Sequence, residues 1–333
     1  MLAATCPGDS LDLAFAPYQA PRPGASIAVI KDGAIIFERA YGLANLATGE
    51  LATGDTSYRL ASVTKQFTAT AILLLAERGE LAIDDPVARH LPELARAAPG
   101  VTLRHLLTHT SGLADYEQLL GDDPRQIVDR DVLALVARQP PARPGKFHYS
   151  NTGYALLALV VERVAKLPYP EFLRRAIFAP LGMTASGAYA AGATIPHRAL
   201  GYRAGADGFV LADQSRTTAV LGDGGVYSST HELARWIDAL DRGTLLPPAR
   251  LAEATRAQVA TDVAGVSYGL GFRLAKHRGE QLVFHTGSTS GFKNALVWVP
   301  ARRLAVAVLT NRRDGEPVEL AQLVLDRYWD GAP

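Results

Sequence analysis

The chain has 333 residues, more than a single hydrophobic core usually supports, so two lobes or one large α/β unit are expected. It carries 34 Lys and Arg against 33 Asp and Glu, and this balance provides no electrostatic footprint for nucleic acid or an anionic membrane surface. A small-molecule or peptide substrate fits this balance better. Because Cys6 is the only cysteine, an intramolecular disulfide and a multi-cysteine zinc site are both excluded.

Membrane and export signals are weak. The longest apolar run, "AILLLA" at 71–76, is far too short to span a bilayer, so we expect no membrane span. The opening "MLAATCPGDS" resembles the trimmed remnant of a signal peptide, because "LAA" is typical of a cleavage neighbourhood. We therefore favour a periplasmic or secreted protein over a cytoplasmic one. No sequence feature indicates an oligomeric state.

The first half of the chain contains strand signals and then helix signals. Two β-rich runs in "ASIAVIKDGAIIFERAYG" flank an Asp-Gly pair at 32–33, which predicts a hairpin. Next, "YRLASVTKQFTATAILLLAERGEL" predicts a helix from about Ser62 to Arg78. Further helical patterns, "NTGYALLALVVERVAKL" and "THELARWIDALDRG", begin after Ser150 and at Thr230, which we predict as N-caps.

The last part of the chain predicts about four strands and a closing helix. Turns are expected at Arg278-Gly279, Thr286-Gly291 and Pro300-Arg302, and the helix runs from about Glu316 to Trp329. Strands thus begin and end the chain, while helices fill its centre.

This order predicts an α/β (α+β) fold with one antiparallel sheet built from both chain ends and flanked by helices. Residues 1–83 and 265–333 are expected to form the sheet lobe, and residues 84–264 an inserted, mostly helical lobe. The active site is expected in the cleft between them.

The pair Ser62 and Lys65 is unusual at the start of an otherwise apolar helix. Positions three apart share a helix face, so the hydroxyl and the amine can point together. A serine hydroxyl is a weak nucleophile unless a neighbouring base takes its proton, and a buried lysine that loses its charge can be that base. Backbone N–H groups at the helix start also stabilise developing negative charge. An N-cap serine and a solvated lysine would explain the same four letters, so the pair needs support from elsewhere.

Two other stretches supply candidate partners. In "FHYSNTGYALL", Tyr149 can relay a proton and the amide of Asn151 can hold a substrate carbonyl. In "VFHTGSTSGF", His285, Thr286 and Gly287 come at the end of a β-run, where a glycine lets a substrate lie close. The backbone N–H of Ser288 is then a candidate oxyanion donor.

Taken in this order, the three stretches resemble the motifs of the serine β-lactamase and penicillin-binding-protein superfamily. The Tyr-x-Asn form of the middle motif is similar to the branch of class C β-lactamases and D-alanyl-D-alanine carboxypeptidases, which also holds D-aminopeptidases and β-lactamase-like esterases. "LLTHTSGL" at 106–113 and "GDGGVYSSTHELARW" at 222–236 resemble recurring stretches of that branch. The resemblance covers about Gly24 to Asn311 and implies a β-lactamase/transpeptidase-like fold.

The resemblance also implies roles for single residues. Ser62 would be the acylated nucleophile, Lys65 its partner, and Tyr149 a proton relay, with the division of labour between the two bases left open. Asn151 would orient the acyl side chain of the substrate, and the N–H groups of Ser62 and Ser288 would form the oxyanion hole. No metal or organic cofactor is implied.

The third motif departs from the best-known pattern because it begins with His285 where many relatives have lysine. A lysine is a full charge suited to a substrate carboxylate, whereas histidine is mostly uncharged at neutral pH. We therefore expect a serine hydrolase of peptides, amides or esters, with D-amino-acid peptides among the candidate substrates and weak β-lactam turnover. The alternatives are a β-lactamase-like esterase, an acyltransferase, and a penicillin-binding module that acylates without turnover. A metal pair formed by His105 and His109 is disfavoured, because no H-E-x-x-H glutamate accompanies them.

Overall fold

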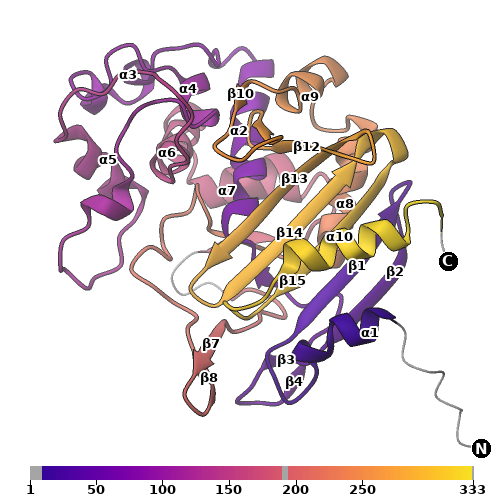
Figure 1. Ribbon diagram of the computed structural model, residues 1–333. Coiled ribbons are helices and arrows are strands. Elements are labelled where there is room, and N and C mark those ends of the chain that lie inside the picture. The colour runs from indigo at the N-terminus through magenta and orange to yellow at the C-terminus, as the bar shows by residue number, and fades with distance from the viewer. Residues whose placement is uncertain (1–9, 190–193, 332–333) are drawn as a thin grey trace, which may run out of the picture.

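The computed structural model describes residues 10–189 and 194–331 (Figure 1). The stretch that contains Cys6 and the "LAA" sequence lies outside the described residues. An eight-stranded antiparallel sheet forms the centre, in the order β10-β11-β12-β13-β14-β15-β1-β2. Its strands are β1 (Ala25–Lys31), β2 (Ala34–Tyr41), β10 (Val259–Ala260), β11 (Ser267–Tyr268), β12 (Arg273–His277), β13 (Glu280–Thr289), β14 (Phe292–Val299) and β15 (Leu304–Thr310). The predicted sheet built from both chain ends is confirmed.

The sheet has an apolar layer on each face because its central strands alternate with period two. In β15, Val306 and Val308 belong to one hydrophobic cluster, and Ala305 and Ala307 belong to the other. Helices α1 (Ser10–Ala14) and α10 (Pro317–Arg327) lie on the first face, and α10 crosses the front of the sheet in Figure 1. Helix α8 (Thr230–Arg242) packs on the opposite face, against β1, β2 and β15.

The predicted Asp-Gly hairpin joins β1 to β2. Asp32 has a φ of +52° and Gly33 a φ of +78°, and two positive φ angles are what a tight type I′ turn requires. The turns at Arg278-Gly279 and at 300–302 are also found, the latter as a short 3₁₀ turn.

Helices gather on one side of the sheet, at the upper left of Figure 1. Two of them, α2 and α6, pack against each other and form the middle of this region. The helices here are α2 (Thr64–Glu77), α3 (Val87–His90), α4 (Leu103–Leu107), α5 (Asp129–Ala137), α6 (Thr152–Ala165) and α7 (Tyr169–Leu173). Helix α9 (Pro248–Ala254) lies at the top of Figure 1, to the right of this group.

Short strands and turns connect these layers. The small sheets pair β3 (Leu43–Asn45) with β4 (Glu50–Leu51), β9 (Val226–Ser228) with β5 (Tyr58–Arg59) and β6 (Gly187–Ala188), and β7 (Tyr202–Gly205) with β8 (Gly208–Leu211). The 3₁₀ turns η1–η4 and η6 cover Ala16–Tyr18, Ala61–Val63, Pro92–Leu94, Tyr116–Leu119 and Pro300–Arg302, while η5, Arg174–Phe178, is a π-helix.

Two local predictions are corrected by the structure. The N-cap of α8 is Ser229, whose side chain accepts from the N–H of Glu232, and Thr230 is already helical. The N-cap position of α6 is Asn151 and not Ser150, because the helix begins at Thr152. Both errors move a cap by one residue and leave the helix in place.

The third motif is part of a strand and not of a turn. The prediction put a turn from Thr286 to Gly291, but β13 continues to Thr289 because Thr286–Thr289 pair with β14. Only Ser290 and Gly291 remain as the turn. The motif therefore has the rigidity of a central strand.

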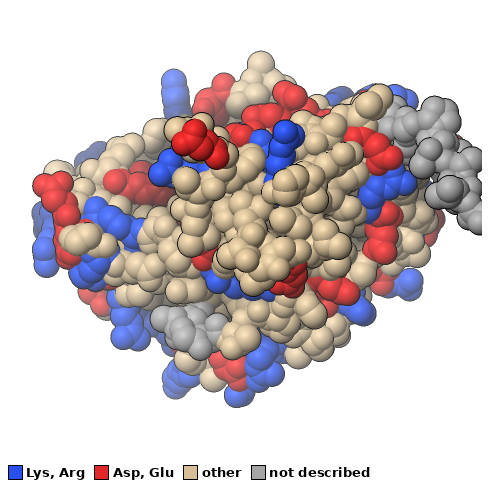
Figure 2. All heavy atoms as spheres, turned by 90° about the horizontal axis from the view of Figure 1, so that it is seen from below, with Lys and Arg blue, Asp and Glu red and all other residues tan. Residues whose placement is uncertain are grey.

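The division into two lobes stays a prediction. The boundary proposed at 264/265 falls inside the sheet, since β10 precedes it and pairs with β11. Helix α8 also falls within the 84–264 range although it covers the sheet. Among residues 10–189 and 194–331, no helix is both long and apolar enough to cross a bilayer. On the face shown in Figure 2, basic and acidic side chains are interspersed around an uncharged central area.

Candidate active site

Ser62 lies in η2, the turn that leads from β5 into α2. The preceding residue, Ala61, has a φ of +49°, a left-handed conformation that costs a non-glycine residue on the order of 1 kcal/mol. Strain of this kind often accompanies functional turns. Here the turn leaves Ser62 half-buried, with its side chain at the wall of a narrow pocket.

Lys65 is fully buried one helical turn after Ser62. Its Nζ atom lies 3.1 Å from Ser62 Oγ, 2.8 Å from Asn151 Oδ1 and 2.9 Å from the backbone oxygen of Asp223. These three acceptors match the three donors of a lysine ammonium. The geometry fixes the nitrogen beside the serine oxygen, at a distance over which a proton can be exchanged.

Tyr149 stands between two cations. The Nζ atom of Lys65 lies 5.0 Å from the centroid of its ring, and the guanidinium carbon of Arg273 lies 5.2 Å from the same point. Both distances are typical of cation–π contacts. A phenol that passes a proton between substrate and enzyme develops negative charge, which flanking cations stabilise.

His285 does not face the pocket as an exposed cation. It is 1% exposed, its Nε2 lies 3.0 Å from Tyr268 Oη, and its Nδ1 lies 2.7 Å from the backbone oxygen of Thr286. Burial, reinforced by Lys65 and Arg273, holds the pKa of His285 well below its usual value. The burial of the ring and the two nearby cations thus favour the uncharged form of His285 that is expected from the sequence.

Strand β13 runs directly beside the nucleophile turn. A Cβ atom on Gly287 would lie 2.1 Å from the backbone oxygen of Leu60, so only glycine permits this approach. As a result Ser288, the next residue, lines the same narrow pocket as Ser62. The remaining lining residues are Arg59, Ala61, Tyr116, Glu117, Asn151, Thr217, Asp223, Gly224 and Thr289.

Two buried carboxyl groups are associated with the loop at 221–224, which contributes to the pocket. Asp223 accepts from Tyr116 Oη at 2.9 Å, and burial raises the pKa of Asp223 to about 6, although the nearby Lys65 opposes the shift. Burial raises the pKa of Asp129 to about 8, although the backbone N–H groups of Leu221 and Gly222 favour its carboxylate form. The loop that carries Asp223 is thereby tied both to Lys65 and to α5.

The predicted substrate-binding residues take two kinds of position. Asn151 lines the pocket, but its Oδ1 accepts from Lys65 and its Nδ2 donates to Glu117 at 3.1 Å. Ser288 also lines the pocket, whereas His285 and Gly287 are buried in β13 behind it. Thr286 is half-buried between them.

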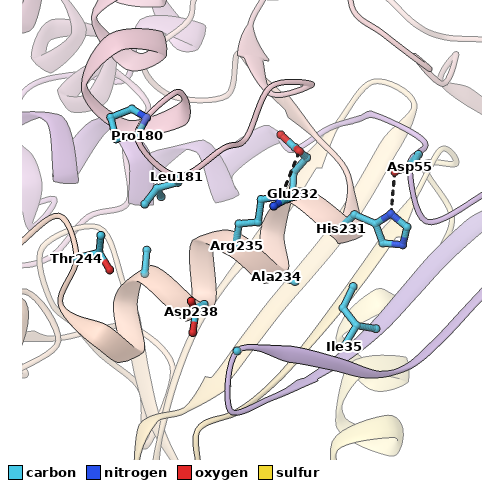
Figure 3. Close-up of a pocket in the computed structure, with 12 residues that line it drawn as sticks. Ile35, Asp55, Pro180, Leu181, His231, Glu232, Ala234, Arg235, Asp238 and Thr244 are labelled. Atoms are coloured by element: carbon cyan, nitrogen blue, oxygen red, sulfur yellow. Dashed lines mark hydrogen bonds and ion pairs between the residues drawn. The ribbon is translucent and has the colours of Figure 1, made fainter.

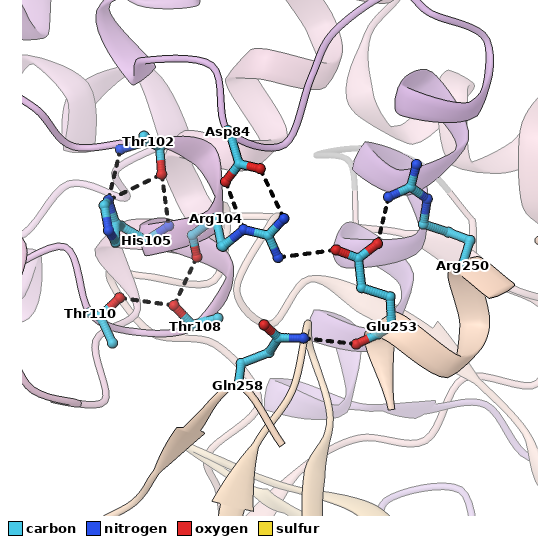
Figure 4. A network of polar contacts seen from close by, with 9 residues as sticks. All are labelled: Asp84, Thr102, Arg104, His105, Thr108, Thr110, Arg250, Glu253 and Gln258. Atoms are coloured by element: carbon cyan, nitrogen blue, oxygen red, sulfur yellow. Dashed lines mark hydrogen bonds and ion pairs between the residues drawn. The ribbon is translucent and has the colours of Figure 1, made fainter. Parts of the chain in front are cut away.

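His105 and His109 do not form a metal pair. His105 caps α4, where its Nδ1 accepts from the backbone N–H of Thr102 at 3.1 Å (Figure 4). Figure 4 also shows Arg104 joining Asp84 to Glu253, so this region holds the helical part together. In the described part of the chain, no group of three or more His, Cys, Asp or Glu side chains is arranged to hold a metal ion.

One large surface cavity is not the active site. It has a volume of about 650 Å³ and lies between the β1–β2 turn, α8 and the segment at Pro180-Leu181 (Figure 3). His231 and Arg235 line it, and the Nδ1 of His231 lies 2.7 Å from Asp55. Its lining contains none of the predicted catalytic residues.

Four residues of the site were missed by the sequence argument. They are Arg273, Glu117, Asp223 and His109, which approach Tyr149, Asn151 and Lys65 from other segments. The stretches "LLTHTSGL" and "GDGGVYSS" signalled two of them, because both are part of the resemblance. Neither Arg273 nor Glu117 lies within a motif whose spacing would identify it as a site residue.

Comparison with known proteins agrees with this geometry. The family described as Beta-lactamase matches residues 11–328. A penicillin-binding protein of Bacillus subtilis (strain 168) is 30% identical over 321 residues, which are 90% of this chain and 70% of that protein. A D-aminopeptidase of Gluconobacter oxydans (strain 621H) is 28% identical over 92% of this chain, and the chain spans 59% of the length of that enzyme.

The solved structures give the same result. The crystal structure of a penicillin-binding protein from Bacillus halodurans superposes with a TM-score of 0.84 at 28% identity, covering 96% of this chain and 99% of that one. The family match extends over nearly the whole chain and includes both the sheet and the Ser62–Lys65 turn. The chain therefore belongs to the Beta-lactamase family and is a serine hydrolase of that family.

Proposed function

We propose that the chain hydrolyses amides or short peptides of D-amino acids through an acyl-enzyme on Ser62. The observation that carries the mechanism is the 3.1 Å contact between Ser62 Oγ and the buried Lys65 Nζ, at the wall of a pocket that also contains Ser288. Lys65 acts from its neutral amine form: it takes the proton of Ser62 as the serine oxygen attacks the substrate carbonyl, becomes an ammonium, and returns that proton to Ser62 when the acyl group leaves. Tyr149 then gives a proton to the leaving amine and takes one from the water that releases the acyl group.

The oxyanion that forms on the carbonyl is proposed to be held by two backbone donors. Ser62 lies in η2, directly before the start of α2, where N–H groups favour negative charge, and Ser288 lies on the strand opposite. The close approach of Gly287 to Leu60 supports this arrangement, because it brings β13 within reach of the nucleophile.

The preference for a free amino group is argued from Glu117. This exposed carboxylate lines the pocket, contacts Asn151, and makes no ion pair with any cation among the described residues. A substrate ammonium would provide the charge partner that Glu117 lacks. The name of the Gluconobacter relative, a D-aminopeptidase, agrees with such a substrate.

A second candidate, a carboxypeptidase or β-lactamase, is favoured by Arg273. Its guanidinium flanks Tyr149, and no carboxylate of the described chain pairs with it. A substrate carboxylate on the leaving-group side could fill this place. A neutral ester has no charged group that Glu117 or Arg273 could bind.

A panel of substrates with matched variants tests these alternatives. The substrates are D-alanine p-nitroanilide, its L-isomer, its N-acetyl derivative, N-acetyl-D-alanyl-D-alanine, nitrocefin and p-nitrophenyl acetate. We expect the free-amine D-substrate to be preferred and Ser62→Ala to abolish every activity. Glu117→Gln should lower kcat/KM for that substrate about tenfold relative to the ester, since about 1.4 kcal/mol corresponds to tenfold.

A glutamate outside the pocket provides the control. Glu50→Gln removes an exposed glutamate in β4, outside the pocket, and should leave the ratio unchanged. Preference for N-acetyl-D-alanyl-D-alanine or nitrocefin, lost in Arg273→Gln, would favour the second candidate. Full activity in Ser62→Ala would reject the mechanism. A stoichiometric burst without steady turnover would identify a penicillin-binding module, and acyl transfer to added alcohols would identify an acyltransferase.

A further inference from the structure

His109 has an unusual backbone conformation just beyond α4. The helix ends at Leu107, and His109 follows with a φ of +57°. Glycine or asparagine normally fills a left-handed position after a helix, because other residues lose about 1–2 kcal/mol there. A histidine that keeps such a conformation suggests that its side chain is needed at this point.

The side chain and backbone of His109 contact three consecutive residues at the start of the middle motif, namely the residue before it and its first two members. The N–H of His148 donates to the backbone oxygen of His109 at 2.8 Å. The N–H of Ser150 donates to His109 Nδ1 at 3.2 Å. Between these two bonds, the imidazole packs on the ring of Tyr149 with centroids 4.3 Å apart and an interplanar angle of 32°. One residue thus fixes Tyr149 from its ring and from the backbone on both sides.

The surroundings of the imidazole require its neutral form. Its ring is 3% exposed and lies among Tyr154, Tyr268 and Phe147. Burial, with Lys65 nearby, holds the pKa of His109 well below its usual value. Because Nδ1 accepts a hydrogen bond, the proton is on Nε2, which has no hydrogen-bond partner among the described residues. An unpaired buried donor costs on the order of 1–3 kcal/mol, so this histidine carries a second penalty in addition to its backbone strain.

We infer that His109 is a positioning residue, which fixes the phenol of Tyr149 relative to Lys65 and Ser62 through the ring contact and the bond from Ser150. The inference rests on the proposed role of Tyr149 as a proton relay. It accounts for both penalties, since glycine or asparagine would relieve the strain but would lose the ring contact. A proton relay is sensitive to placement, and misplacement by about 1 Å can cost up to about 100-fold in rate.

Two variants of His109 separate the ring from the acceptor. His109→Asn tolerates the left-handed backbone and keeps an acceptor oxygen near the position of Nδ1, but removes the ring. His109→Phe keeps a ring beside Tyr149 but removes the acceptor. Phe147→Leu is the matched control, because it removes an edge contact to His109, at 5.7 Å between centroids, and leaves both hydrogen bonds and the Tyr149 contact.

The decisive measurement is a double-mutant cycle with Tyr149→Phe, using p-nitrophenyl acetate, which does not depend on the substrate class proposed above. Each His109 variant should lower kcat about 10- to 100-fold in the background with Tyr149 and less than about twofold in the Tyr149→Phe background. Phe147→Leu should keep kcat within about twofold in both. Thermal unfolding monitors folding, and either His109 variant that folds is sufficient for the cycle.

The outcomes distinguish this inference from the proposed function. Equal losses in both backgrounds would show that His109 supports only the fold, and wild-type rates in both variants would show that it supports nothing in catalysis. Either result overturns the inference and leaves the role of Tyr149 intact. A Tyr149→Phe enzyme as active as wild type would overturn both together.

Discussion

At the scale of single residues, the site combines the buried amine of Lys65 with the half-buried side chains of Ser62 and Tyr149, which act on the substrate. Lys65 contacts Ser62 through its Nζ atom, and the guanidinium of Arg273 lies over the ring of Tyr149. The positive charges of Lys65 and Arg273 remain close together because the buried His109 and His285 beside them are neutral. A protonated His285 would add a further positive charge to this group, at a buried position with no carboxylate partner in its hydrogen bonds. The neutral histidine is therefore a structural requirement for the cations around it.

His285→Lys should harm the enzyme with every substrate. The variant places a second ammonium where the pKa of histidine is already depressed by burial and by Lys65 and Arg273, and it removes the ring that bonds Tyr268 and Thr286. We expect a loss of unfolding free energy on the order of 3 kcal/mol and lower kcat/KM for carboxylated and neutral substrates alike. Denaturant unfolding and the ratio of the two efficiencies measure these effects. His285→Gln, which stays neutral, is the control and should lose less stability. A selective gain on carboxylated substrates would contradict this assignment and support a substrate-facing position for the residue.

The residues that sequence alone identifies are those in local motifs. Ser62 and Lys65 are one helical turn apart, so their contact follows from helix geometry. Tyr149 and Asn151 were found through the resemblance, and the structure brings both to Lys65. Arg273 escapes such reasoning because it comes from a neighbouring strand, β12, and reaches Tyr149 through tertiary packing.

At the scale of elements, the pocket depends on the contact between η2 and β13. The turn carries the nucleophile, and the strand carries Gly287 and Ser288 past it. Central strands cannot shift alone, since β13 is held by β12 on one side and by β14 on the other. The width of the pocket is thus set by the contact between the backbone of Gly287 in β13 and the backbone of Leu60 before η2.

Gly287→Ala should widen this contact and inactivate the enzyme. The added Cβ would meet the backbone oxygen of Leu60 at 2.1 Å, so the turn or the strand must move. Overpacking of this kind typically costs about 1–3 kcal/mol, and we expect kcat/KM to fall by at least about 100-fold. Gly121→Ala is the matched control, because its Cβ meets nothing within 4 Å. Thermal unfolding and ester hydrolysis of both variants check the prediction; equal activities would mean that the strand has room that the structure does not show.

Elements were predicted well where turn chemistry or long periodicity marks them. The Asp-Gly hairpin, the C-terminal strands and the closing helix follow from such signals, although the helix ends at Arg327 and not at Trp329. The N-caps were misplaced because Ser228, Ser229 and Thr230 are all chemically competent, and tertiary contacts decide between them. The length of β13 was underestimated because small residues such as Gly287 and Ser288 resemble a turn until the pairing with β14 is known.

At the scale of the whole molecule, the helical side of the sheet buries titratable groups whose pKa values shift in opposite directions. Burial lowers the pKa of His109 and of His285 and raises that of Asp129 to about 8. The two histidines take up protons when the protein unfolds in mild acid, whereas Asp129 loses its proton when the protein unfolds near neutrality. Stability therefore depends on pH through particular sites even though the net charge is only +1.

Asp129→Asn isolates one of these contributions. The folded pKa of about 8 lies above the ordinary value of 3.8, so this carboxyl contributes stability that is present below pH 4 and is lost as the pH rises toward 8. Relative to wild type, the Asn variant should gain unfolding free energy with increasing pH, by up to about 1.4 kcal/mol per pH unit for one proton. Urea unfolding between pH 5 and 8 measures the difference.

Asp84→Asn is the control for that measurement. Hydrogen bonding to Arg104 lowers the pKa of Asp84, so this residue is ionised in the folded and unfolded states above pH 5. Its difference from wild type should be flat over the same range. A flat difference for Asp129→Asn as well would mean that Asp129 is ionised in the fold.

The pairing of β1 with β15 has a consequence for the order in which the molecule can assemble. Ala25 lies opposite Thr310, so the centre of the sheet closes only when segments nearly three hundred positions apart in the chain meet. During synthesis β1 has β2 as its only available partner until β15 has left the ribosome, and its other edge stays open as an apolar strand. Folding dominated by such distant contacts is slow. A nascent chain of this protein should therefore remain inactive and dependent on protection from aggregation until β15 has been made.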